Sequence, residues 1–104
     1  MPSIEIAGKQ VTVDDEGFMT VYDEWSEEIA EVLAAQIEID LTPRHWEVIQ
    51  FLRKDYKKEG EPSTSRHTQT VGGFPIKEQF QLFPKKPAKK MSYIAGLPKP
   101  KGCI

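Results

Sequence analysis

Hydrophobic and polar residues alternate over the first part of the chain, with the two-residue period of a half-buried β-strand. Two such stretches flank Ala7-Gly8, a dipeptide suited to a tight turn. The apolar positions of this alternation are Ile4, Ile6, Val11 and Val13. The pattern therefore predicts a β-hairpin over residues 3–13.

From residue 23 onwards the apolar positions recur every three or four residues, which is the period of an amphipathic α-helix. The clearest helix begins after Thr42, a favourable N-cap, with Pro43 at its first position and Gly60 at its end. Its expected inward face consists of Trp46, Ile49, Leu52, Arg53 and Tyr56.

Four shorter helices are expected around this one. The first covers residues 23–37, with Trp25, Ile29, Val32, Leu33 and Gln36 facing inward and acids crowding its first turns. The others run from a cap at Ser63 or Thr64 to about Val71, from Pro75 to a stop at Pro84, and from Pro87 to about Ile94. The aromatic residues assigned to the core are Trp25, Trp46, Phe51, Tyr56, Phe80 and Phe83.

After Gly96 the pattern of regular elements stops. Pro98 and Pro100 exclude regular helix and central strand, and Gly96 and Gly102 permit bending. We therefore expect residues 1–95 to form one mainly α domain, a small orthogonal helical bundle with an N-terminal hairpin. Residues 96–104 are expected to form a flexible, extended C-terminal arm.

The arm carries the single cysteine of the chain, Cys103, as its penultimate residue. A thiolate is the reactive form of cysteine, and the positive charges of Lys99 and Lys101 favour it. The terminal carboxylate next to Cys103 opposes it. A thiol at this position is suited to delivery into another protein, where it could hold sulfane sulfur as a persulfide. A disordered tail with an incidental cysteine is the alternative interpretation.

Charge is distributed unevenly along a chain whose net charge is −2. The first forty residues hold eleven acids and one base, whereas residues 79–104 hold six lysines and no acid. Either region can serve for docking to a protein partner. The unpaired thiol fits a reducing compartment, and the apolar runs are too short for a membrane span. We therefore expect a cytoplasmic protein that is a monomer when free.

Other candidate residues favour structural roles. His45 and His67 have no second His or Cys at ligand spacing, so no metal is expected, and no cofactor motif is present. His45, in the first turn of a helix, is expected to be structural, and His67 to be exposed. Arg66 is a possible contact for a phosphate or for the carboxylate of the arm. A DNA-binding regulator is a further alternative, but the acidic overall charge argues against it.

The C-terminal sequence from Tyr93 to Ile104 reads Y-I-A-G-L-P-K-P-K-G-C-I, which closely resembles the ending of the DsrC/TusE family. Similar segments occur over nearly the whole chain. They include Gly8-Lys9, Asp14 to Phe18, Trp25, Leu41-Thr42, His45-Trp46, Phe51 to Arg53, Leu82 to Pro84 and Pro87-Ala88.

This resemblance implies a compact helical domain and sulfur handling by Cys103. It implies protein partners: a Tus- or DsrEFH-type sulfur donor complex, and a thiouridylase or sulfite reductase as acceptor, with nucleic acid involved only indirectly. It implies a sulfurtransferase in the relay sense, without an active-site pocket of its own.

The chain departs from the sulfite-reductase type at Ser92, eleven residues before Cys103, where that type has a second cysteine. A hydroxyl cannot form a disulfide, so the resemblance favours a single-thiol carrier of the TusE type, acting towards tRNA 2-thiouridine or in general sulfur trafficking. A DsrC-like gamma subunit of dissimilatory sulfite reductase is the alternative.

Overall fold

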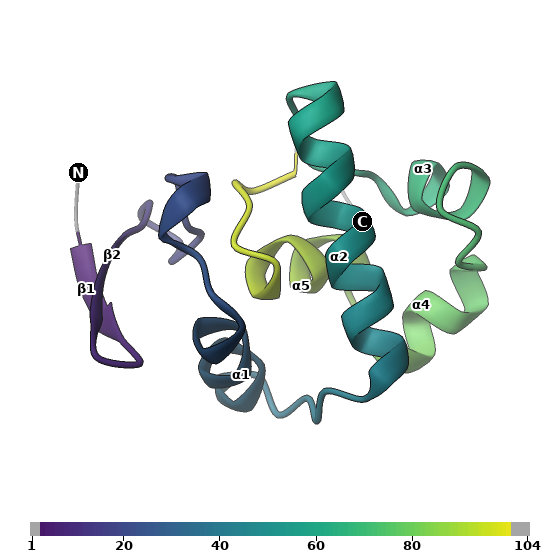
Figure 1. Cartoon of the computed structure of the whole chain (residues 1–104). Coiled ribbons are helices and arrows are strands. Elements are labelled where there is room, and N and C mark those ends of the chain that lie inside the picture. The colour runs from purple at the N-terminus through teal and green to yellow at the C-terminus, as the bar shows by residue number, and fades with distance from the viewer. Residues whose placement is uncertain (1–2, 101–104) are drawn as a thin grey trace.

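The computed structural model describes residues 3–100 and folds them into five α-helices and an N-terminal hairpin (Figure 1). The hairpin consists of β1 (Ser3–Ile6) and β2 (Lys9–Thr12), and a 3₁₀ turn, η1 (Tyr22–Glu24), precedes the helices. The helices are α1 (Glu27–Gln36), α2 (Pro43–Glu59), α3 (Ser65–Thr70), α4 (Ile76–Leu82) and α5 (Pro87–Ile94). The expected mainly α fold with its hairpin is therefore confirmed.

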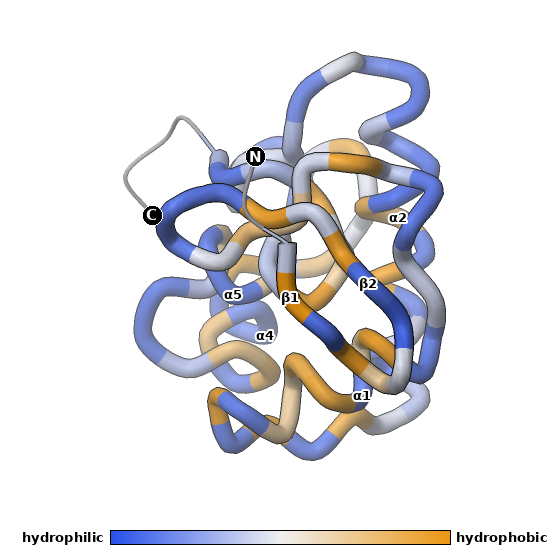
Figure 2. Tube along the Cα trace, turned by 90° about the vertical axis from the view of Figure 1, so that its left-hand side faces the viewer, coloured by the Kyte–Doolittle hydropathy of each residue, from blue (hydrophilic) through white to orange (hydrophobic). Residues whose placement is uncertain are grey.

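The hairpin closes through the predicted Ala7-Gly8 turn. Both residues have positive φ, 53° and 79°, which is the conformation of the two-residue turns that match strand twist. The antiparallel pairing sets Ile4 opposite Val11. Figure 2 shows both strands lying in front of the helices, with hydrophobic and hydrophilic positions alternating. The buried side of the hairpin packs with α1 in a small second core of Ile6, Val11, Val13, Met19, Ile29 and Leu33.

Helix α1 begins later than the pattern predicted. Residues 22–24 form a 3₁₀ turn, Trp25 is extended, and the helix starts only after Ser26, whose hydroxyl accepts a hydrogen bond from the Ile29 amide at 3.3 Å. This local cap competes with continuation of the helix from residue 23. The prediction that Gln36 faces inward is also wrong, because Gln36 is exposed while Ala30 and Ala34 are buried.

Helix α2 has the predicted ends. Thr42 caps its N-terminus and Gly60, with φ of 80°, closes its C-terminus through a bond from its amide to the Tyr56 carbonyl. His45 is buried and structural, as expected. Its Nδ1 accepts from the Thr42 amide at 3.1 Å, and its Nε2 donates to the Leu82 carbonyl at 2.8 Å, which ties α2 to α4.

One residue on α4 reverses a sequence expectation. Phe80 is 45% exposed, so its assignment to the core is wrong, and the neighbouring Gln79 is buried instead. The Gln79 amide nitrogen donates to the carbonyls of Ser65 and Phe74 at 3.0 and 2.7 Å. These two bonds tie α4 to the start of α3 and to the loop that precedes α4, so the buried amide takes the place that spacing alone gave to an aromatic ring.

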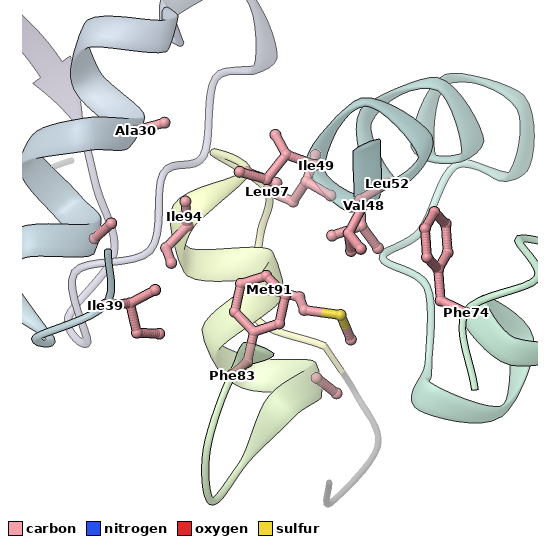
Figure 3. Packing of buried hydrophobic residues seen from close by; sticks show 13 residues of the cluster. Ala30, Ile39, Val48, Ile49, Leu52, Phe74, Phe83, Met91, Ile94 and Leu97 are labelled. Carbon is pink, nitrogen blue, oxygen red and sulfur yellow. The ribbon is translucent and has the colours of Figure 1, made fainter. Parts of the chain in front are cut away.

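The main core lies between α5 and the helices α1 and α2. Figure 3 shows Met91 of α5 pointing towards Val48 of α2, Ile94 on the side of α5 that faces Ala30 and Ile39, and Leu97 next to Ile49. Leu97 is fully buried. Within residues 3–100, no helix has the length and apolar character needed to cross a membrane.

Candidate functional site

The C-terminal tail is described only as far as Pro100, so Cys103, Lys101 and Gly102 lie outside the described residues. In the described part, Leu97 and Pro100 are buried, Pro98 is half-buried and Lys99 is exposed. Packing against the helical domain therefore continues past residue 95 and through the first five residues of the expected arm.

Gly96 turns the chain out of α5. It has φ of 72°, its amide donates to the Tyr93 carbonyl at 3.4 Å, and the Leu97 amide donates to the Ser92 carbonyl at 3.0 Å. These two bonds form the Schellman arrangement that commonly ends a helix at glycine. The following apolar residue, Leu97, then enters the core. The direction of the tail is thus set by the helix that precedes it.

Gly96 also lies directly against Trp25. A Cβ atom at Gly96 would come within 2.3 Å of Trp25 Cδ1, which is closer than real Cβ contacts allow. The indole Nε1 of Trp25 donates to the Ile94 carbonyl at 2.9 Å, one of the carbonyls that a helix end leaves unpaired. Trp25 therefore caps the end of α5 and requires glycine at the turn.

Arg53 of α2 provides the second cap. Its Nη1 donates to the Ala95 carbonyl at 2.8 Å and its Nη2 to the Tyr22 carbonyl at 3.0 Å. The guanidinium carbon lies 3.9 Å from the ring centre of Tyr22 and 4.1 Å from that of Trp25, which are cation–π distances. Burial lowers the pKa of Arg53, but a guanidinium in a protein stays charged. We call Tyr22, Trp25, Arg53 and Gly96 the tail-base cluster, because their contacts join η1 and α2 to the turn after α5.

Beyond this cluster, Lys99 in the described part of the tail forms an ion pair with the N-terminal region. Lys99 Nζ lies 2.6 Å from Glu16 Oε2, with both side chains well exposed. Exposed pairs of this kind contribute little stability. Next to Glu16, a shallow hollow of about 310 Å³ is lined by Glu16, Phe18, Ile37, Lys89, Lys90 and Tyr93. Burial raises the pKa of the Tyr93 phenol, whose hydroxyl donates to Gln36 Oε1 at 2.9 Å.

Ser92 is fully buried in α5, and its hydroxyl has no hydrogen-bond partner among residues 3–100. At this position the resemblance places the second cysteine of the sulfite-reductase type. The side chain is therefore chemically unable to form a disulfide and is also shielded from solvent.

The remaining candidates lie on α3. Arg66 is exposed, and its expected contact with the terminal carboxylate involves residue 104, outside the described range. His67 is half-buried rather than exposed. Its Nε2 lies 2.9 Å from Asp55 Oδ1 on α2.

Two features of these sites were not predicted from the sequence. Trp25 and Arg53 were assigned to inward helix faces, but no local signal connects either residue to Gly96, which is far away in the chain. The grouping of His67 with Asp55 and Glu59 was also missed. The only available signal was the spacing of the two acids, four residues apart on one face of α2.

Comparison with known proteins covers the whole chain. The family model described as "DsrC like protein" matches residues 5–104. The dissimilatory-type sulfite reductase subunit gamma of Nitratidesulfovibrio vulgaris is 38% identical over 105 residues, spanning all of both chains. Sulfurtransferase TusE of Escherichia coli K12 is 38% identical over 104 residues, spanning 93% of this chain and 95% of TusE.

The fold matches as well. The NMR structure of Allochromatium vinosum DsrC aligns with a TM-score of 0.83 and 38% identity, covering 98% of this chain and 97% of that protein. The similarity in sequence and in fold thus extends over nearly the full length of this chain and of the proteins compared with it. The chain belongs to the DsrC-like protein family.

Proposed function

We propose that this protein is a sulfur carrier that holds sulfane sulfur as a persulfide on Cys103 and passes it to a partner protein. The observation that supports this most directly is the family match itself, which extends to residue 104 and so includes the only cysteine of the chain. Relatives that span nearly the full length carry the name sulfurtransferase.

The proposed step needs no external oxidant or reductant. The Cys103 thiolate attacks the outer sulfur of a donor persulfide, R–S–SH, and a new S–S bond forms while the donor S–S bond breaks. The donor thiolate leaves with the electron pair, and Cys103 becomes a persulfide. The thiolate of an acceptor protein then attacks the outer sulfur of the Cys103 persulfide in the same way, and Cys103 leaves as a thiolate. Because the thiolate is the nucleophile, the positive charge of Lys101 favours the reaction, whereas the charge of Lys99 is paired with Glu16 and the terminal carboxylate opposes the reaction.

The tail-base cluster supports presentation of this thiol on one defined face. Gly96, Trp25 and Arg53 set the direction of the chain out of α5, and Leu97 and Pro100 are packed. From Pro100 to Cys103 there are three residue steps, which span at most about 11 Å. A partner must therefore approach the side of the molecule where the tail passes η1 and α2 (Figure 1).

The test is intact-mass spectrometry after incubation with cysteine desulfurase and a persulfidated donor. We expect the native chain to gain one sulfur, about 32 Da, that is removed by a reducing thiol, and Cys103→Ser to gain none. The same mass gain on both chains would show that sulfur is held elsewhere. The melting temperatures of the two chains should agree, which would separate loss of the thiol from loss of folding.

A second candidate function is supported by the match to the sulfite reductase gamma subunit, which spans the full length of both chains. In this case the protein would bind dissimilatory sulfite reductase and would use Cys103 only in bonds to other molecules, because Ser92 excludes an internal disulfide. Gel filtration with purified sulfite reductase and with a TusE-type donor complex distinguishes the two. We expect co-elution with the donor complex; co-elution with sulfite reductase alone would favour the gamma-subunit function.

A further inference from the structure

Three side chains with metal-binding chemistry meet away from the tail, where α2 ends and α3 begins. Asp55 and Glu59 are one turn apart on α2, and His67 comes from α3. One ligand atom from each of the three lies within 4.8 Å of the other two. Two of these groups already touch, since His67 Nε2 is 2.9 Å from Asp55 Oδ1.

Asp55 is unusual for a carboxylate on a helix. Its side chain is only 5% exposed, and it lies on the face of α2 that also buries Val48 and Leu52. Its second oxygen, Oδ2, is buried and has no hydrogen-bond partner within residues 3–100. A buried carboxylate oxygen without a partner is costly, and a bound cation is one of the standard ways to satisfy it.

The three residues share a hollow that can hold an ion. It has a volume of about 180 Å³ and is lined also by Glu61, Ser63 and Thr64. Its acidic residues are Asp55, Glu59 and Glu61, and no lysine or arginine of the described chain lines it. The hollow therefore concentrates negative charge and leaves room for water molecules to complete a coordination shell.

We propose that Asp55, Glu59 and His67 bind one divalent transition-metal cation, with Zn²⁺ as the best fit. Zinc accepts one imidazole nitrogen and two carboxylate oxygens at about 2.0–2.2 Å and often keeps a water as a further ligand. Two ligands of a tetrahedral zinc ion lie roughly 3.3 Å apart by that geometry, so the His67–Asp55 pair needs to open by only a few tenths of an ångström. Mg²⁺ and Ca²⁺ prefer all-oxygen shells, so the imidazole selects against them.

The functional consequence is a link between two helices. The bound ion joins the C-terminal turns of α2 to the short helix α3, which otherwise contacts mainly α4. It would stabilise the folded state by an amount that grows with the logarithm of the metal concentration above the dissociation constant, as any ligand of the native state does.

The test is titration of the full chain with ZnCl₂, followed by calorimetry and by the melting temperature. The Cys103→Ser background removes the thiol, which is itself a zinc ligand. In that background we expect one Zn²⁺ per chain with micromolar or tighter affinity, and a higher melting temperature on binding. Absence of uptake at roughly 100 µM Zn²⁺ would overturn the proposal.

The chain provides a matched pair of variants. Glu59→Gln removes one ligand, and Glu61→Gln removes an equal charge from the same hollow without removing a ligand. Both residues are exposed, so both variants should fold. We expect Glu59→Gln to weaken Zn²⁺ binding at least tenfold and Glu61→Gln less than threefold, and a large excess of Mg²⁺ to leave binding unchanged. If both variants weakened Zn²⁺ binding equally, the ion would be held by general charge attraction, and the proposed three-residue site would be overturned.

Discussion

Gly96 is the residue whose identity the structure explains most directly. It has positive φ, and any side chain there would meet Trp25. Gly60 provides a comparison, because it also ends a helix with positive φ but has no atom within 4 Å of an added Cβ. Two separate costs can therefore be distinguished: the left-handed backbone, present at both sites, and the collision, present at one.

We expect Gly60→Ala to cost about 1 kcal/mol of unfolding free energy, from the backbone conformation alone. Gly96→Ala should cost about 2–5 kcal/mol, because displacement of the Trp25 ring adds to the same backbone term. Urea denaturation of both variants measures the difference. Equal losses would show that Trp25 moves aside freely and that the tail base is not tightly packed.

Two buried serines allow a second comparison at this scale. Ser92 has an unpartnered hydroxyl, whereas the hydroxyl of Ser63 bonds to Thr68 Oγ1 at 2.7 Å. Ser92→Ala should stabilise the fold by about 0.5–1 kcal/mol, since it removes an unpaired polar group and improves helix propensity. Ser63→Ala should destabilise it by about 1 kcal/mol. Thermal unfolding gives the sign of each change in stability. A loss of stability in both variants would contradict the conclusion that the Ser92 hydroxyl has no hydrogen-bond partner.

At the scale of elements, the bidentate pair between Arg44 and Glu78 joins α2 to α4. Arg44 Nε and Nη2 both donate to Glu78 at 2.8 Å, and these bonds lower the pKa of Glu78 below its ordinary value of 4.5. A carboxyl whose folded-state pKa is depressed contributes stability above its unfolded pKa and loses it as pH falls through the folded pKa.

Glu78→Gln should therefore lower the melting temperature at pH 7 by a few degrees at most, because the pair is partly exposed. The difference in melting temperature between the variant and the native chain should shrink as the pH falls below 4.5. Added salt should also reduce this difference. Glu47→Gln is the control, since Glu47 contacts the same arginine at 2.9 Å but is 60% exposed. A difference in melting temperature that does not narrow at all as the pH falls would mean that the glutamine change acts through packing.

The elements themselves were predictable where their signals are local. Thr42, Pro43 and Gly60 mark the ends of α2 in the sequence because caps act within one turn of the chain. The start of α1 was missed although its cap is also local, because the acids and Trp25 fitted a helical period equally well. The burial of Gln79 in place of Phe80 was not predictable, since the carbonyls that Gln79 satisfies belong to Ser65 and Phe74, which only the fold brings close.

At the scale of the whole molecule, the packed domain extends past the boundary that the sequence predicts. The pattern of prolines and glycines placed that boundary at residue 96. Leu97, however, belongs to the main core beside Ile49 of α2 (Figure 3), and its amide donates to the Ser92 carbonyl of α5. Sequence position alone cannot reveal this, because a leucine between glycine and proline gives no periodic signal.

Removal of residues 97–104 should therefore destabilise the domain as well as remove the thiol. Loss of the buried Leu97 side chain alone should cost about 2–5 kcal/mol, so Leu97→Ala in the full chain should reproduce most of the effect and lower the melting temperature by more than about 10 °C. Val71→Ala, at a residue that is 60% exposed, should change it little. If the deletion left the melting temperature unchanged, residues 97–100 would be an independent arm, and the tail-base cluster would not direct the thiol.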